Sequence, residues 1–178
     1  MFAAWLPLWG VLAGHGVAVR QDPDSALLYR FRDAVQVTTD SLETLRGLAL
    51  AFRNDLRLAS PTLVLARATA VQNACISGAS ALRRLQGILA ARTVSRAAAR
   101  SQAEFRSTAE ETVAALDRCA RSWDPLPRTD ARADTLRAWG PYRVAQLDQL
   151  LTRYDASRRV FVKAAGLPAA ARPSAPKH

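Results

Sequence analysis

Apolar residues recur at alternating intervals of three and four between positions 28 and 59. An α-helix turns once every 3.6 residues, so this spacing lines the residues along one face that a partner helix must cover. The pattern lasts for over four heptads, which predicts a single helix about 50 Å long. The expected seam consists of Leu28, Phe31, Val35, Thr38, Leu42, Leu45, Ala49, Phe52, Leu56 and Ala59.

Capping signals divide the chain around this seam. Asp22-Pro23-Asp24-Ser25 starts the first helix, and Ser60-Pro61 ends it and caps a second. Ser101 and Glu104 fit a reciprocal capping box for a third helix, which Asp124-Pro125 ends. The expected seam of the second helix is Val64, Ala68, Val71, Cys75, Gly78, Leu82, Leu85 and Leu89, and that of the third is Phe105, Ala109, Thr112, Leu116, Cys119 and Trp123.

The last helical region contains a break signal. Thr129 or Asp130 can cap a short segment that runs to Trp139. Gly140-Pro141 then either separates it from a long fourth helix or kinks one continuous helix. The expected inward residues are Val144, Leu147, Leu151, Tyr154 and Phe161, with Arg158 on the same line.

Four helices with three short connections predict an all-α fold. We expect an antiparallel up-down four-helix bundle with coiled-coil-like heptad seams over residues 19–166. The alternative is an elongated coiled-coil hairpin that forms a homodimer through the same seams. Residues 167–178 have the Pro, Ala and Ser composition of a flexible tail.

The helical register bears on the two cysteines. In an antiparallel pair, the numbers of facing residues have a constant sum; a sum of 120 matches the first two seams and sets Leu42 opposite Gly78. A sum of 194 matches the second and third seams and sets Cys75 opposite Cys119. A register shifted by one heptad also matches, but it leaves the cysteines about 10 Å apart, too far for a bond. The Ser101 cap and the expected export favour the first register, which predicts a Cys75–Cys119 disulfide. Two free core cysteines, or a catalytic or metal-binding cysteine, remain alternatives.

The N-terminus resembles a secretory signal. Residues 1–18 hold an apolar run and then small residues, with Gly16-Val17-Ala18 as the expected cleavage site before Val19. No Lys or Arg precedes this run, so an uncleaved anchor through residues 2–19 and a buried or surface segment of a cytosolic protein are the alternatives.

Arginine dominates a formal net charge of +10. If the second helix continues through positions 93–100, five arginines form one cationic edge on it; a tight turn at positions 94–96 is the alternative. Such an edge suits anionic lipid headgroups, a cell-wall polymer or an acidic protein, whereas a solvated basic face is the other interpretation. Nucleic acid is disfavoured because no aromatic residues alternate with these arginines. The expected edge consists of Arg83, Arg84, Arg92, Arg96 and Arg100.

Catalytic chemistry is poorly represented. The only histidines are His15 and His178, which removes Ser-His-Asp triads and His-containing zinc sites from the bundle. No phosphate-binding or dinucleotide-binding glycine motif occurs, so we expect no cofactor and no metal. The carboxylates of the third helix are expected to pair with arginines on the surface, although an enzyme using carboxylates alone remains open. Trp139 and Tyr142 flank the helix break, where corner packing or a groove is expected.

These features favour an exported, non-enzymatic helical-bundle protein of the cell envelope that binds or scaffolds a partner. Two alternatives remain: a cytosolic basic protein that binds nucleic acid, and a membrane-tethered periplasmic coiled coil that acts as a sensor or spacer.

Overall fold

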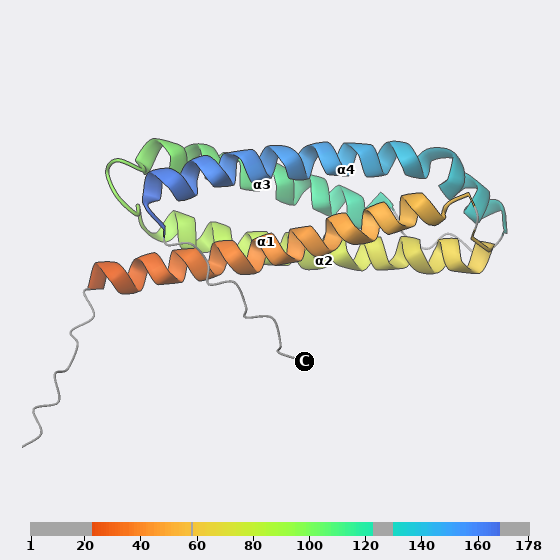
Figure 1. Cartoon of the computed structure of the whole chain (residues 1–178), viewed down its shortest axis with the longest axis horizontal. Helices are drawn as coiled ribbons and strands as arrows, with labels where there is room; N and C mark the ends of the chain where they lie inside the picture. Colours follow the sequence, from red (N-terminus) through yellow and green to blue (C-terminus); the bar gives the residue numbers. More distant parts are fainter. Residues whose placement is uncertain (1–22, 58, 123–129, 168–178) are drawn as a thin grey trace, which may run out of the picture.

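A computed structural model describes residues 23–57, 59–122 and 130–167 of the chain. These residues form four helices and no strand: α1 (Pro23–Asp55), α2 (Pro61–Ala91), α3 (Ala99–Ser122) and α4 (Asp130–Ala165). The helices lie lengthwise, with α1 and α2 on one side of the molecule and α3 and α4 on the other (Figure 1). The all-α prediction is confirmed, and the arrangement is compatible with a four-helix bundle. The expected leader lies outside the described residues, as does the tail from position 168 onward.

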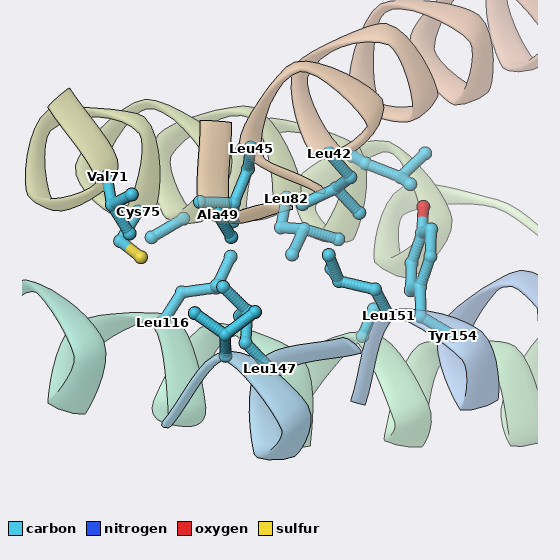
Figure 2. Packing of buried hydrophobic residues seen from close by; sticks show 14 of the residues in the cluster. Leu42, Leu45, Ala49, Val71, Cys75, Leu82, Leu116, Leu147, Leu151 and Tyr154 are labelled. Atoms are coloured by element: carbon cyan, nitrogen blue, oxygen red, sulfur yellow. The ribbon is translucent and has the colours of Figure 1, made fainter. Parts of the chain in front are cut away.

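The heptad seams form the core. Every described position of the predicted seams is buried or half-buried within this one chain. Figure 2 shows Leu45, Leu82 and Leu116 turned toward one another from three helices. Two seam positions are polar: the hydroxyl groups of buried Thr38 and Thr112 donate to the carbonyl oxygens four residues earlier, at 2.8 and 2.7 Å. Their polarity is therefore satisfied within their own helices.

Gly78 belongs to both predicted helix pairs, since α2 is expected to pack against α1 and against α3. A Cβ atom placed on Gly78 would be 3.1 Å from Leu42 Cδ2 on α1 and 3.2 Å from Leu116 Cδ1 on α3. These are its predicted partners on both helices. Both contacts are those that the sums of 120 and 194 predict for Gly78, and the absent side chain lets three helices approach closely.

Of the two N-terminal caps predicted for α2 and α3, the first is present and the second is not. Ser60 caps α2 as predicted, with its hydroxyl oxygen accepting from the Leu63 amide at 3.4 Å. The predicted capping box at Ser101 is wrong: α3 begins at Ala99, and the Ser101 hydroxyl donates to the Ala98 carbonyl oxygen at 2.9 Å. The Ser95 hydroxyl accepts from the Ala98 amide instead, at 3.1 Å.

Long side chains from other helices bond carbonyl groups at and just beyond the C-terminal ends of α1 and α2. The Arg137 guanidinium on α4 donates to the carbonyl oxygens of Leu56 and Ala59, at 3.1 and 2.9 Å. The Gln102 amide on α3 donates to the carbonyl oxygens of Leu89 and Arg92, at 2.8 and 2.7 Å. Helix ends leave carbonyl groups without intrahelical partners, and a cation there also complements the helix dipole.

Only α4 among the described helices ends on a left-handed glycine. Gly166 has a φ of 61°, and the amide of Leu167 bonds the Val162 carbonyl oxygen while that of Gly166 bonds the Lys163 carbonyl oxygen. This pair of bonds is a Schellman motif, which commonly brings the following residue back onto the helix. Leu167 is accordingly buried. It belongs to the core rather than to the flexible tail expected from position 167.

The helix break that was one expectation for Gly140-Pro141 does not occur. Helix α4 continues through both residues. Figure 1 shows that α4 changes direction near its start, in keeping with the alternative of a kink at the proline. Gly140 packs directly on α1: a Cβ there would lie 2.9 Å from the Phe52 ring. The glycine therefore serves close helix packing rather than termination.

Candidate functional site

The two cysteines form a disulfide. Cys75 on α2 and Cys119 on α3 are bonded, with Cα atoms 6.2 Å apart, and neither is free. Cys75 is fully buried, whereas Cys119 is half-buried and packs against the core. A bonded sulfur is neither a nucleophile nor a thiolate ligand, so the cysteine alternatives of free core residue, catalyst and metal ligand do not describe this structure.

The five arginines of the predicted cationic edge do not share one helix edge. Helix α2 ends at Ala91, and Arg92 is extended, with φ and ψ of −153° and 147°. Arg83 pairs with Asp117 on α3, and Arg100 pairs with Glu104 at 3.0 Å. The continued helix is wrong because the Gln102 amide satisfies the α2 carbonyls and the turn at Ser95 starts α3. Arg96 lies exposed in that turn.

Two members of the set, Arg84 and Arg92, border a groove between α1 and α2. Arg30 on α1 joins them, and the groove has a volume of about 920 Å³. All three side chains are exposed and make no ion pair with any residue that the structure describes. Asp33 also lines the groove, but its carboxylate is held by Arg32 at 2.7 Å. The groove thus carries three guanidinium groups that no described carboxylate neutralises.

The floor of this α1–α2 groove is apolar. Val37 is 54% exposed there, and Gly87 adds further space because nothing lies within 4 Å of the position of its missing Cβ. An apolar floor with a few charged groups at its border is typical of sites for amphipathic ligands. The other apolar lining residues are Leu27, Ala34, Ala81, Leu85, Ile88 and Ala91.

Arg30 was not among the five arginines predicted from the sequence, although the register of the first two helices indicates its place. The sum of 120 that aligns α1 with α2 sets position 30 opposite position 90, between Arg84 and Arg92. Reading the charges of α1 through that register would have placed all three arginines at one end of the helix pair.

Three of the four carboxylates of α3 act as ion-pair partners. Glu104 pairs with Arg100, Glu110 with Arg106 at 3.0 Å, and Asp117 with Arg83. Within the described part of the chain, no group of three or more His, Cys, Asp or Glu side chains is arranged to hold a metal ion. These three pairings match the expected surface roles.

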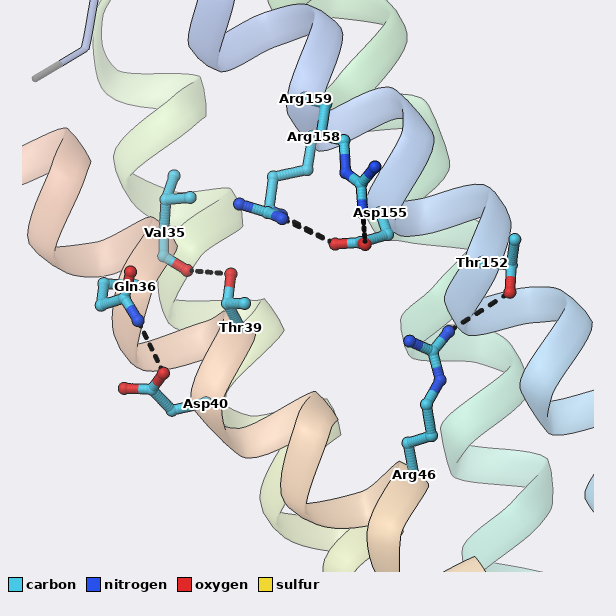
Figure 3. Close-up of polar contacts among 9 residues, drawn as sticks. All are labelled: Val35, Gln36, Thr39, Asp40, Arg46, Thr152, Asp155, Arg158 and Arg159. Carbon is cyan, nitrogen blue, oxygen red and sulfur yellow. Dashed lines mark hydrogen bonds and ion pairs between the residues drawn. The ribbon is translucent and has the colours of Figure 1, made fainter. Parts of the chain in front are cut away.

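A polar cluster sits where α1 and α4 diverge (Figure 3). Asp155 accepts from Arg158 at 2.8 Å and from Arg159 at 3.0 Å. Burial alone would raise the pKa of Asp155, but the hydrogen bonds and charges of these two arginines outweigh it and hold the pKa below its usual value. The carboxylate therefore stays ionised and suits an ion-pair role rather than that of a proton donor.

Tyr154 is buried beside this cluster. Its side chain is 2% exposed, and its hydroxyl oxygen has no hydrogen-bond partner among the described residues. Burial raises the pKa of the Tyr154 phenol well above its usual value of about 10. The ring lies 5.4 Å from that of Phe105, so Tyr154 acts mainly as an aromatic core residue.

Arg46 joins α1 to α4 at the next level of the bundle. Its Nη2 atom donates to the Thr152 hydroxyl at 3.3 Å (Figure 3). Its Nε atom is 3.0 Å from an Asp148 carboxylate oxygen, yet it has no aligned hydrogen bond. The contact is therefore an ion pair by distance, and its role is to position two helices.

The two aromatic residues near Pro141 of α4 behave differently. Trp139 packs against the core and lies under the Arg143 guanidinium, 5.3 Å from the ring centroid. Tyr142 is 65% exposed, and its hydroxyl accepts from the Gln146 amide at 2.7 Å. The expected corner packing therefore describes Trp139 but not Tyr142.

Comparison with protein-family models, with curated proteins and with solved structures finds no match to this chain. Across the described helices, none combines the length and apolar character that crossing a membrane requires.

Proposed function

We propose that this protein is an exported, non-enzymatic bundle of the cell envelope that binds acidic phospholipid surfaces through the α1–α2 groove. The observation that carries the proposal is the placement of Arg30, Arg84 and Arg92, exposed and without ion-pair partners among the described residues, around an apolar floor. The proposal covers the finer fold as well: an antiparallel up-down bundle is supported by contacts that pair Thr38 with Ala81 and Asp55 with Arg67.

The chemistry of the groove suits a phospholipid. A guanidinium group offers a planar fork of donors that matches phosphate oxygens, while the apolar floor covers the glycerol and upper acyl carbons. Each cationic side chain near an acidic membrane contributes about 1 kcal/mol of binding free energy. Three such groups together correspond to roughly a hundredfold in affinity.

Export is supported by two features of the chain. The N-terminal 18 residues have the composition of a signal peptide, and the Cys75–Cys119 bond is compatible with an oxidising compartment. N-terminal sequencing of protein from a fractionated native host tests this part. A start at Val19 outside the cytosol is expected, whereas an unprocessed cytosolic chain would contradict export and favour the nucleic-acid alternative. An intact N-terminus in the membrane fraction would favour the tethered spacer.

Vesicle binding tests the lipid proposal. Full-length mature protein is sedimented with phosphatidylcholine vesicles that contain or lack 30% phosphatidylglycerol, a composition we choose as roughly that of a strongly acidic membrane surface. Binding to the acidic vesicles alone is expected. The triple variant Arg30→Ala, Arg84→Ala and Arg92→Ala should lose roughly a hundredfold in affinity.

A matched control removes the same charge elsewhere. Arg53, Arg57 and Arg121 are also exposed and make no ion pair within the described chain. Their triple alanine variant should lose only a little affinity for the acidic vesicles, because it removes only long-range attraction between the protein and the membrane. Added salt screens that attraction. Equal losses in the two triple variants would show diffuse charge attraction and defeat the groove proposal. Equal binding to neutral vesicles would defeat the headgroup argument.

A further inference from the structure

A second groove lies between α3 and α4. These two helices lie on the other side of the molecule from α1 and α2 (Figure 1). Its volume is about 580 Å³. The lining residues form one continuous stripe on each helix, over positions 111–122 of α3 and 143–153 of α4. Each stripe is about 15 Å long, or three helical turns. A third helix laid along this groove would meet both walls over its whole length.

Small residues keep the groove open. Helix α3 contributes Ala114, Ala115 and Ser122 to the wall, where larger side chains would fill the space. Leu147 and Leu150 of α4 provide the apolar floor opposite them. Small residues allow a further helix to pack closely, because ridges of side chains on one helix fit the grooves of its neighbours.

The charges around this α3–α4 groove are mostly positive. Arg118, Arg143 and Arg153 line it against a single acid, Glu111. Neither Arg118 nor Arg153 makes an ion pair with any described residue, and Glu111 makes none either. Arg143 stacks on Trp139 and makes no ion pair within the described part of the chain. An occupant with acidic residues on either side of an apolar stripe would complement this pattern.

This chain itself is a poor source of such an occupant. A second copy carries a net charge of +10 and would be repelled. Beyond the described helices, residues 1–22 contain one acidic residue, Asp22, and residues 168–178 contain none. Charge complementarity therefore points to a different protein.

We propose that the α3–α4 groove docks an amphipathic α-helix of a partner protein, one with glutamate or aspartate residues beside a short apolar stripe. In this mode, apolar residues at successive helical turns enter the groove, and the flanking acids meet the arginines. The inference goes beyond the lipid function and does not depend on it, because the two grooves share no lining residue.

A synthetic peptide tests the docking directly. The probe is a dye-labelled, 15-residue, alanine-based peptide with three leucines on one face and four flanking glutamates, titrated with the full mature protein by fluorescence anisotropy. The glutamate peptide is expected to bind, and a peptide with lysine in place of each glutamate is expected not to bind. Equal binding of the two peptides, or no binding of the glutamate peptide, would overturn the proposal.

Variants of the groove separate charge from shape. The double variant Arg118→Ala and Arg153→Ala should weaken binding about tenfold. Ala114→Trp fills the groove from an exposed position of α3 and should abolish binding while the thermal unfolding midpoint stays within a few degrees of wild type. The matched control, Arg121→Ala with Arg53→Ala, removes two arginines outside the groove and should leave binding unchanged. A control variant that weakens binding as much as the groove variant would overturn the assignment.

The lipid assay keeps the two proposals distinct. The Arg118→Ala and Arg153→Ala variant should bind acidic vesicles like the control triple variant. The Arg30, Arg84 and Arg92 variant should still bind the glutamate peptide. If peptide and vesicles compete for one surface, the docking proposal fails while the lipid proposal stands.

Discussion

The Gln102 side chain on α3 donates a hydrogen bond to the backbone carbonyl oxygen of Leu89 on α2, at 2.8 Å. The same amide nitrogen reaches Arg92, and the side-chain oxygen accepts from the Val94 amide at 2.9 Å. One buried side chain thus replaces the glycine that commonly ends a helix and holds the α2–α3 turn.

Replacing Gln102 should destabilise the protein strongly. Gln102→Leu leaves two carbonyl groups and one amide without their partner, so we expect the free energy of unfolding to fall by about 2–4 kcal/mol. Urea denaturation followed by circular dichroism measures this. The matched control is Gln86→Leu, because Gln86 on α2 is half-buried and makes no hydrogen bond within the described chain. A loss in the control equal to that in Gln102→Leu would contradict the capping role.

Removing the Cys75–Cys119 bond should also cost stability. The bond closes a separation of 44 residues, and the chain-entropy estimate for such a loop is about 4 kcal/mol. Cys75→Ala with Cys119→Ala should lose that amount relative to oxidised wild type in guanidinium denaturation. Non-reducing mass spectrometry should give a mass two hydrogens below that of the reduced chain. Labelling of both thiols without denaturant would show that the bond does not form.

Two glycines should respond to alanine in opposite directions. Nothing lies within 4 Å of a Cβ at Gly87, so Gly87→Ala should gain about 0.5–1 kcal/mol from helix propensity. At Gly140 the new methyl would meet the Phe52 ring at 2.9 Å, so Gly140→Ala should lose about 1–3 kcal/mol through overpacking. Thermal unfolding of both variants decides the matter. A stabilising Gly140→Ala would mean that α4 is not held against α1 there.

Tyr154→Phe should stabilise the bundle. The phenol is buried without a hydrogen-bond partner among the described residues, so its removal relieves a desolvation cost of about 1 kcal/mol. The ring contact with Phe105 is kept. A drop in stability in this variant would mean that the hydroxyl is satisfied after all.

The same residue predicts a dependence on alkaline pH. Burial raises the pKa of the folded Tyr154 phenol, whereas the unfolded phenol ionises near pH 10. Above that pH the unfolded state holds fewer protons than the folded state, so the folded state loses stability as the pH rises. The stability advantage of Tyr154→Phe over wild type should therefore grow above pH 10. An advantage that stays constant from pH 8 to pH 11 would contradict the buried phenol.

The core could be predicted from the heptad spacing of apolar residues, because this spacing decides which face of a helix is buried. The seams, the position of Gly78 between two leucines and the Cys75–Cys119 pair all follow from heptad spacing and a constant sum. Helix ends depend on groups that spacing does not describe. Ser101 looked like a cap, but buried Gln102 and Ser95 decide where α3 begins.

The binding surface was predicted only in part for a related reason. Arg84 and Arg92 belong to the expected set, yet the turn after α2 separates Arg96 and Arg100 from them. Arg83 is neutralised by Asp117, a contact between helices that one-dimensional charge counting does not reveal. Grooves arise from the side chains of two helices together, so neither helix pattern alone predicts them.

Arg137 bonds the carbonyl groups of Leu56 and Ala59, just after the end of α1 and about eighty residues earlier in the chain. A chain truncated before Arg137 lacks both hydrogen bonds, so these two carbonyl groups would have to take water as their partner.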